Sequence, residues 1–232
     1  MALTRNMAPE TAQAYRILCE FCALPLCENP SDQVLDRLIE QRDLLCDEPF
    51  ASVAPEPALE LHALLEQAAA GAADEVKAAI RRDYAYLFLM VGTSGTSPFE
   101  SVYRTDDRTM FGPTTLEVRE AYRAWDVQVP GFGSVPDDHL GFELLFLAYL
   151  LGAAQEDEVA QVERALDDVV AFLSDHVLVF APTYLHNVGV RAKEPFYRAL
   201  AAVAAATIAS MAANLETKAS DRIDEVAYIL PE

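Results

Sequence analysis

Two carboxylates and an imidazole stand on consecutive residues in the run Pro136-Asp137-Asp138-His139, and Glu143 follows four positions after the histidine. Side chains four residues apart share one face of a helix, so Glu143 is expected beside His139 if a helix begins here. Such groups can bind a cationic ligand, but an aspartate at a helix start can also accept the free amides of the first turn. A ligand site, and a helix cap provided by Asp137 or Asp138, are both compatible with these residue types.

The motifs that would make this group a catalytic centre are missing from the sequence. It contains no Gly-x-Ser-x-Gly and no His-Glu-x-x-His, and one histidine beside two acids does not define a metal site. The run Gly92-Thr93-Ser94-Gly95-Thr96-Ser97 has the small residues of a phosphate-binding loop, but it lacks the Gly-Lys-Ser/Thr ending. We predict no catalytic residue, no metal site and no cofactor. The alternative is a small nucleotide-binding enzyme that uses the 92–97 loop together with Asp138 and His139.

A second candidate segment is Pro98-Phe99-Glu100-Ser101-Val102-Tyr103. Proline restricts the backbone, and the rings of Phe99 and Tyr103 offer flat apolar surface with little rotamer entropy to lose. Such rings suit a groove that binds a peptide. The alternative is that both rings fill the core beneath a loop, as aromatic side chains often do.

Helical periodicity and capping residues recur along the chain, while the alternation typical of strands does not. We therefore predict an all-α, single-domain helical bundle over residues 1–232, with a candidate hinge in the loops between 91 and 136. The segment from Asp137 to Leu151 is apolar nearly all round, which predicts the central buried helix. Ser31 is the expected N-cap of a helix that follows Pro30. The other expected helices span 9–26, 58–70, 73–90, 113–125, 155–175, 176–185 and 194–215, and Pro49, Pro55 and Pro57 are expected to mark a loop.

Two further features of composition concern the core. The alanine-rich segment 199–215 is marginal in length for a membrane span and includes polar residues, so we predict an internal packed helix and no stable membrane insertion. The four cysteines, Cys19, Cys22, Cys27 and Cys46, lack the partners of a zinc or thioredoxin-like site. They are expected to be buried free thiols of the core.

The chain of 232 residues carries 37 acidic and 17 basic residues, which gives a formal net charge of -20. Such a surface should repel nucleic acid and attract basic ligands at long range, although high acidity also simply favours solubility. Residues 1–9 lack the apolar core of a secretory signal, so a cytoplasmic protein is expected. The role of residues 216–232 is open, since Val226, Tyr228, Ile229 and Leu230 would allow this segment to dock on the domain.

Several motifs in this order resemble those of the TorD/DmsD family of redox-enzyme maturation chaperones. They are Asp83 to Met90, Ser97 to Tyr103, Met110 to Leu116, Pro136 to Leu145, His176 to Phe180 and Pro195 to Arg198. The resemblance covers about half of the chain well. It implies an all-helical cytoplasmic protein that binds the twin-arginine signal peptide of a molybdopterin-containing oxidoreductase and guards the apoenzyme until its cofactor is inserted. It also implies either a monomer or a domain-swapped dimer, and allows weak GTP binding.

Carried onto this sequence, the resemblance implies a non-enzymatic protein whose peptide-binding residues are Pro98, Phe99, Ser101, Tyr103, Pro136, Asp138, His139 and Glu143. The chain departs from the family at three places. Tryptophans common in the 98–103 segment are absent, Val179-Phe180 replaces a Pro-Trp pair, and Gly92 stands where some relatives carry an aromatic residue. A structural helical subunit of a larger complex is a further alternative. The acidic groups would attract the arginines of the signal, and the aromatic rings would hold its apolar part.

Overall fold

The computed structural model describes residues 7–89, 96–105, 108–130, 135–156 and 158–220, and regular structure in these ranges is helical. One isolated antiparallel bridge pairs Phe99 with His139. The helices are α1 (Pro9–Cys27), α2 (Asp32–Glu40), α3 (Phe50–Val53), α4 (Pro55–Gln67), α5 (Ala73–Tyr84), α6 (Ser101–Arg104), α7 (Pro113–Arg123), α8 (Leu140–Ala153), α9 (Val159–Phe172), α10 (Leu178–Arg191) and α11 (Pro195–Asn214). Four short turns join them: η1 (Arg42–Cys46), η2 (Ala68–Ala72), η3 (Ala85–Leu89) and η4 (Leu173–Val177). The predicted all-α class is confirmed.

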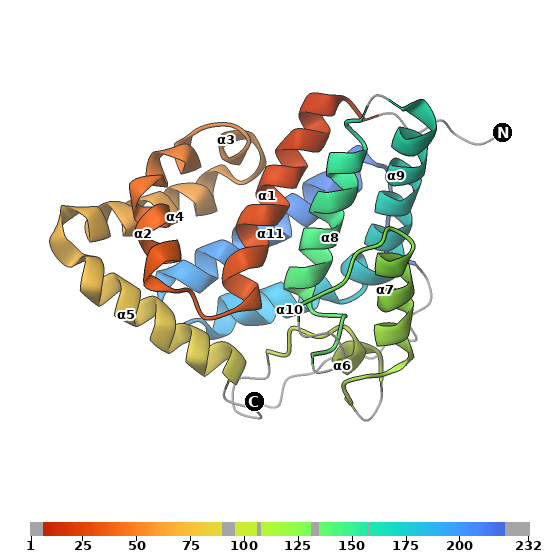
Figure 1. Ribbon diagram of the computed structural model, residues 1–232. Helices are drawn as coiled ribbons and strands as arrows, with labels where there is room; N and C mark the ends of the chain where they lie inside the picture. The colour runs from red at the N-terminus through yellow and green to blue at the C-terminus, as the bar shows by residue number, and fades with distance from the viewer. Residues whose placement is uncertain (1–6, 90–95, 106–107, 131–134, 157, 221–232) are drawn as a thin grey trace.

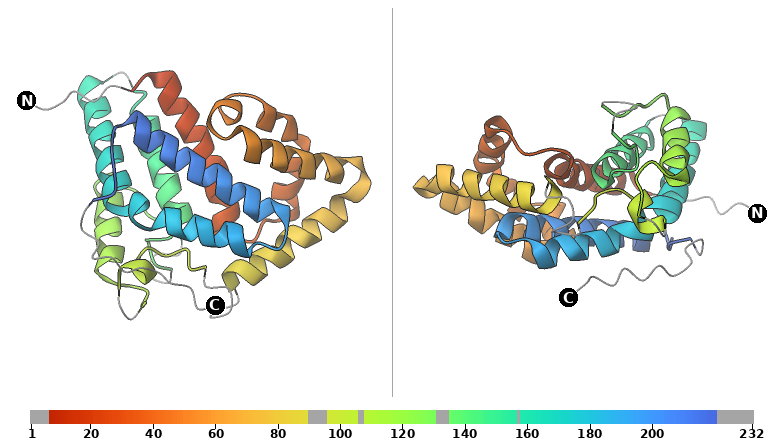
Figure 2. Two further views of the ribbon diagram at one scale, coloured as in Figure 1. Left: turned by 180° about the vertical axis from the view of Figure 1, so that it is seen from behind. Right: turned by 90° about the horizontal axis from the view of Figure 1, so that it is seen from below.

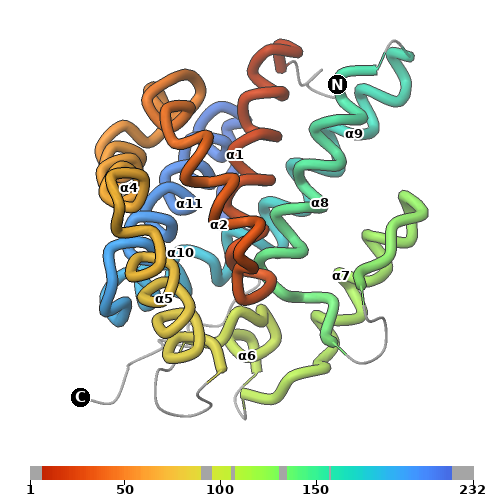
Figure 3. Tube along the Cα trace, turned by 60° about the vertical axis from the view of Figure 1, so that its left-hand side comes forward, coloured from red at the N-terminus to blue at the C-terminus, as the bar shows by residue number. Residues whose placement is uncertain are grey.

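The centre of the molecule is formed by α1 and α8, which lie side by side, with α11 behind them (Figure 1). Helices α10 and α11 pack on one another and form the layer seen in front when the molecule is viewed from behind (Figure 2). Helices α2, α4 and α5 lie on one side of this centre (Figure 1), and Figure 3 shows α7 and α9 on the side opposite to α4 and α5. The segment with α6 lies at the lower end of α8, between these two sides (Figure 1).

The helix α8 is central because its sequence is apolar on every face, which suits a helix covered by neighbours all round. It approaches α1 closely at Gly141. A Cβ atom placed on Gly141 would lie 2.5 Å from Sγ of Cys27 and 3.1 Å from the carbonyl oxygen of Ala23. The absence of a side chain at Gly141 therefore sets the distance between α1 and the start of α8.

Replacing Gly141 with alanine is expected to lower the free energy of unfolding by about 2 kcal/mol, because the added methyl group overpacks this contact. Urea denaturation followed by circular dichroism measures the change. Gly189 in α10 provides the control, since a Cβ there meets nothing within 4 Å. Gly189→Ala should be neutral or stabilising, because alanine favours a helix more than glycine does. Equal stability of both variants would contradict the close packing at Gly141.

Most predicted helix positions agree with the structure, and the differences have physical causes. The side chain of Ser31 accepts a hydrogen bond from the amide of Val34 at 3.3 Å, which confirms it as the N-cap of α2. The expected loop at the prolines is wrong, because α3 begins after Pro49 and α4 begins at Pro55. Proline is tolerated in a first helical turn, where its missing amide would have no partner. Gly71, with φ of 121°, separates α4 from α5 as expected.

The prediction for the cysteines is confirmed in part. All four are free, and Cys19 and Cys22 are buried in α1. Burial raises the pKa of the Cys19 thiol to about 12, so this thiol is unreactive at neutral pH. Cys27 is half-buried, and Cys46 is exposed at the end of η1, so the expectation of a core position is wrong for Cys46.

Helix α11 is long and apolar enough to cross a membrane, and it is the one such helix in the described ranges. However, 61% of its most apolar window is buried inside the molecule, which is the behaviour of a core helix. The prediction of a packed internal helix is confirmed.

The carboxylate of Asp83, in α5, accepts hydrogen bonds from the amides of Lys193 and Glu194, each at 3.1 Å. It thereby fixes the start of α11.

Candidate functional site

Asp138 joins three segments of the chain. Its Oδ2 accepts a hydrogen bond from the amide of Ser101 at 2.7 Å, and its Oδ1 accepts one from the hydroxyl of Thr115 at 2.9 Å. The side chain is fully buried. Because Ser101 is the first residue of α6, the carboxylate satisfies an amide at the start of that helix. Asp138 therefore holds α6 and α7 against the residues that lead into α8.

Backbone hydrogen bonds reinforce this junction. The amide of Glu100 donates to the carbonyl oxygen of Asp138 at 2.9 Å, and the amide of Leu140 donates to that of Pro98 at 2.8 Å. These two bonds flank the bridge between Phe99 and His139. The 98–101 segment is thus fixed along the 138–140 segment by main-chain contacts, which do not depend on the identity of a side chain.

His139 is the N-cap of α8, so the expectation that Asp137 or Asp138 takes this place is wrong. Its Nδ1 accepts a hydrogen bond from the amide of Gly141 at 3.0 Å. Burial lowers the pKa of His139 to about 4, and the neutral ring has the free lone pair that this bond requires. Helix α8 begins at Leu140, three residues later than predicted, because Asp137 and Asp138 bind elsewhere.

Asp137 is paired with Arg119 of α7. Both Nε and Nη2 of Arg119 contact Oδ2 of Asp137, at 3.0 and 2.6 Å. The hydroxyl of Tyr122 donates to the carbonyl oxygen of Asp137 at 3.2 Å. The two neighbouring aspartates thus bind α7 in different ways. Asp137 forms an ion pair with Arg119, and Asp138 accepts a hydrogen bond from the hydroxyl of Thr115.

Next to this junction, Glu100 contacts Arg104 and His176, an arrangement that was not predicted from the sequence. Glu100 is fully buried, and its Oε1 accepts a hydrogen bond from Arg104 at 2.6 Å while its Oε2 contacts Nδ1 of His176 at 3.0 Å. Arg104 also donates to the carbonyl oxygen of Asp175 at 3.1 Å. Glu100 therefore ties α6 to η4, the turn that precedes α10.

Glu143 lies one turn into α8 and is fully buried. Neither of its carboxyl oxygens has a hydrogen-bond partner among the described residues. Burial raises the pKa of Glu143 well above its usual value, and the nearby negative charges of Glu100 and Asp138 raise it further, while Arg104 opposes them. The fold therefore favours the protonated form of this side chain, which lies next to carboxylates that are bound by other groups.

The two predicted aromatic residues have different environments. Phe99 is half-buried, and its ring lies edge-on to that of His139 with 5.3 Å between centroids. Tyr103 is buried, its hydroxyl donates to the carbonyl oxygen of Ser97 at 2.9 Å, and its ring packs on Phe180. Tyr103 thus belongs to the core beneath the loop, while part of the Phe99 side chain is exposed to solvent.

The structure brings the eight predicted site residues to one junction between the 98–103 and 136–143 segments. Most of them are buried: Ser101, Tyr103, Pro136, Asp138, His139 and Glu143. Pro98 and Phe99 are half-buried and form the outer part of the junction. Glu100, Arg104, Thr115, Arg119 and His176 also belong to it, although the sequence did not single them out as site residues. Of the 92–97 loop, residues 92–95 lie outside the described residues, and the hydroxyl of Thr96 donates to the carbonyl oxygen of Leu87.

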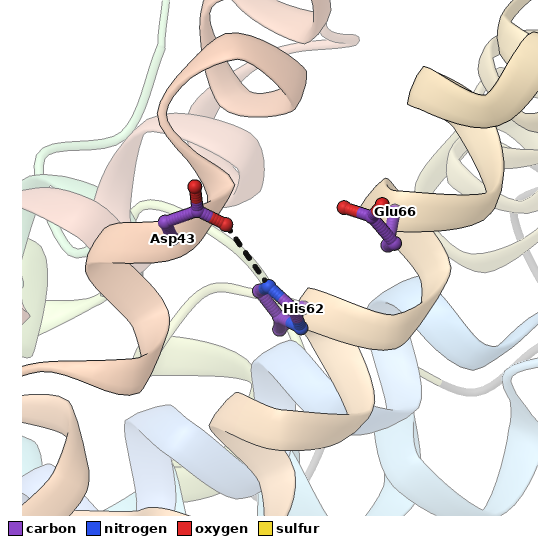
Figure 4. Close-up of side chains that lie close together, drawn as sticks. All are labelled: Asp43, His62 and Glu66. Carbon is purple, nitrogen blue, oxygen red and sulfur yellow. Dashed lines mark hydrogen bonds and ion pairs between the residues drawn. The ribbon is translucent and has the colours of Figure 1, made fainter.

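A separate cluster joins η1 to α4. Asp43, His62 and Glu66 each offer one ligand atom, and these atoms lie within 4.8 Å of one another (Figure 4). Nε2 of His62 contacts Oδ1 of Asp43 at 3.2 Å, and Arg42 binds Oε2 of Glu66. Because Asp43 and Glu66 already have these partners, a hydrogen bond from His62 to Asp43 and an ion pair between Arg42 and Glu66 account for the cluster.

The chain matches the family described as nitrate reductase delta subunit over residues 52–185, which is more than half of its length. This range contains the whole of the junction around Asp138. The chain therefore belongs to this family, and the resemblance to the TorD/DmsD chaperones is confirmed.

Two relatives illustrate the similarity. A protein of Vibrio cholerae (strain O395) named chaperone protein TorD is 35% identical over 103 residues, which are 44% of this chain and 46% of the relative. A protein of Salmonella typhi named Tat proofreading chaperone DmsD is 30% identical over 118 residues, which are 51% of this chain and 53% of the relative. The chain thus spans about half the length of the curated relatives it matches.

Proposed function

We propose that the protein is a cytoplasmic chaperone that binds the twin-arginine signal peptide of a molybdopterin-containing oxidoreductase and assists its maturation before export. Membership of the family and the names of its relatives support a chaperone role. The signal peptide and the apo form of the oxidoreductase are the proposed partners. Holding the signal would delay export until the cofactor has been inserted.

The observation that carries this proposal is the aromatic surface held by the junction. The ring of His139 contacts those of Phe99 and Phe142, with centroid distances of 5.3 and 5.2 Å, and both phenylalanines are half-buried. The bonds around Asp138 fix Phe99 relative to α8 before any peptide arrives. A surface arranged in advance binds an apolar segment at a lower entropy cost.

The arginines of the signal need acidic groups that are open to solvent, which Asp138 and Glu143 are not. A cavity of about 150 Å³ adjoins the junction at His176 and is lined by Trp125, Phe172, Asp168 and Asp175. The guanidinium carbon of Arg164 lies 4.2 Å from the centroid of the Trp125 ring, so the chain's own arginine already stacks on this ring, and Asp175 is the acidic group of the cavity that remains for a client arginine. We place the arginine of the client here, next to Asp175.

A peptide with two arginines followed by an apolar segment is expected to bind more tightly than its twin-lysine analogue, because guanidinium stacks on rings and binds carboxylates in a fork. Asp175→Asn should lower the affinity for the arginine peptide about tenfold, a loss of about 1.4 kcal/mol. Isothermal titration measures both effects. Trp125 is the only tryptophan of the chain, so its fluorescence reports on the cavity directly.

Glu163→Gln is the matched control, since Glu163 is an exposed acid of α9 and its replacement also removes one negative charge. It should reduce the affinity only slightly, through the long-range field, and this part should disappear as salt rises. If neither peptide binds while GTP does, the nucleotide-binding alternative is supported and the chaperone proposal is wrong. If the peptide binds with no change in Trp125 fluorescence, the arginine site lies elsewhere.

A further inference from the structure

One face of α8 is incompletely covered by the rest of the described chain. Five residues of this helix are not buried, and they follow the spacing i, i+3, i+7, i+10 and i+11: Phe142, Leu145, Tyr149, Gly152 and Ala153. This spacing places all five on one side of the helix, here called the α8 face. A helix whose sequence is apolar on every side is expected to have neighbours all round, so the α8 face is a candidate surface for a partner.

A groove of about 410 Å³ runs along the α8 face, between α8 and the neighbouring α1 (Figure 1). The two helices are antiparallel, because Gly141 lies against the end of α1 while Gly152 lies against Arg16, nearer its start. Arg16 and Glu20 line the groove on the α1 side, and Leu24 continues this row one turn further. Leu24 is 55% exposed, so the α1 side of the groove also carries an uncovered apolar side chain.

The two ends of the groove differ in charge. Its charged lining residues, Arg16, Glu20 and Glu156, lie at the end that contains Gly152. Nε of Arg16 pairs with Oε1 of Glu20 at 3.0 Å, and the described residues provide Glu156 with no cationic partner. The other end is bordered by apolar side chains. This polarity fits a segment with a positive end followed by an apolar stretch.

The α8 face also connects the two parts of the site proposed above. At one end, the ring of Phe142 contacts that of His139, which contacts Phe99, with centroid distances of 5.2 and 5.3 Å. At the other end, the ring of Tyr149 lies edge-on to that of Trp125, with 6.1 Å between centroids. Trp125 lines the cavity in which we place the arginine of the client. A line of apolar and aromatic side chains thus runs from that cavity to Phe99.

We infer that the apolar segment of the client's signal peptide binds as a helix along the α8 face, in the groove between α1 and α8. This inference rests on the proposed function and adds a path and a direction to it. With the arginines at Trp125, the segment runs towards Phe99, opposite to the direction of α8. The α8 face extends about 16 Å, which a helix of about eleven residues covers. Leu24, Leu145 and Tyr149 are the side chains that select the apolar segment.

Two leucines of equal exposure test this path. Leu24 in α1 and Leu59 in α4 are each 55% exposed, but Leu59 does not line the groove. Leu24→Ser should lower the affinity for a peptide of two arginines and a leucine-rich segment about fivefold, because an apolar contact is lost. Leu59→Ser should leave the affinity unchanged. Isothermal titration measures both values, and circular dichroism melting checks that the variants are folded.

A second peptide separates the apolar contact from the arginine contact. It keeps the two arginines and has serines in place of the leucines. This peptide should bind the native protein and Leu24→Ser with the same, lower affinity. A nitroxide placed next to the arginines of the leucine-rich peptide should quench the fluorescence of Trp125 more strongly than one at the far end. Stronger quenching from the far end would show that the segment does not run towards Phe99.

The outcomes distinguish this inference from the proposed function. If the native protein, Leu24→Ser and Tyr149→Ser bind the leucine-rich peptide equally well, the α8 face does not bind the segment, and the chaperone proposal stands without it. If the native protein binds neither peptide, both proposals are wrong. Sedimentation of the protein alone tests for a second copy of the chain. A dimer that Leu24→Ser dissociates would assign the α8 face to that copy and overturn the inference.

Discussion

Replacing Asp138 with alanine is expected to lower the free energy of unfolding by about 3 kcal/mol, because two buried donors lose their acceptor. They are the amide of Ser101 and the hydroxyl of Thr115. This effect is larger than that of an exposed helix cap, which contributes about 1 kcal/mol. Urea denaturation at pH 7 measures it.

The same variant should also weaken binding of the signal peptide, since Asp138 fixes the segment that carries Phe99. Glu117→Ala is the control, because Glu117 is an exposed acid of α7 and its replacement removes the same charge. Peptide affinity should be measured well below the melting temperature, so that only folded protein is compared. If Asp138→Ala and Glu117→Ala have the same free energy of unfolding, the hydrogen bonds of Asp138 do not stabilise the fold.

The fold was largely accessible from the sequence because its signals are local. The apolar run of α8 and the caps at Ser31 and Gly71 each depend on residues a few positions apart, and each was predicted correctly. The prolines at 55 and 57 were misread because a proline at the start of a helix and a proline in a loop look alike without the neighbouring backbone.

The site was accessible in outline only. The two segments were identified as candidates, but their contacts join residues that are distant in the chain. Glu100 and His176 are separated by 76 positions, and Asp83 lies 110 positions before the amide of Lys193. No spacing rule reaches that far. Asp138 was expected to cap the helix that follows it, but His139 takes that place, and Asp138 instead accepts the amide of Ser101 at the start of α6. Only the three-dimensional arrangement reveals this.

The burial of Glu143 makes stability depend on pH in a direction that can be worked out. In the unfolded chain this carboxyl ionises near its ordinary pKa, while in the fold it stays protonated to a higher pH. Between these two pKa values the unfolded state binds fewer protons than the native state, so rising pH favours unfolding. Within that window the free energy of unfolding falls by about 1.4 kcal/mol for each pH unit.

Glu143→Gln should remove this loss, because an amide of nearly the same shape does not ionise. The variant is expected to match the native protein near pH 4 and to become progressively more stable than it as pH rises, until the native Glu143 ionises in the fold. Urea denaturation across the pH range measures the difference in the free energy of unfolding between the variant and the native protein. Glu163→Gln, at an exposed position, is the control, and its difference from the native protein should not change with pH. If the difference in the free energy of unfolding between Glu143→Gln and the native protein does not change with pH, the native Glu143 carboxylate is ionised and stabilised in the fold. A widening difference would show that the chain retains a destabilising acid at this junction, which is typical of groups kept for function.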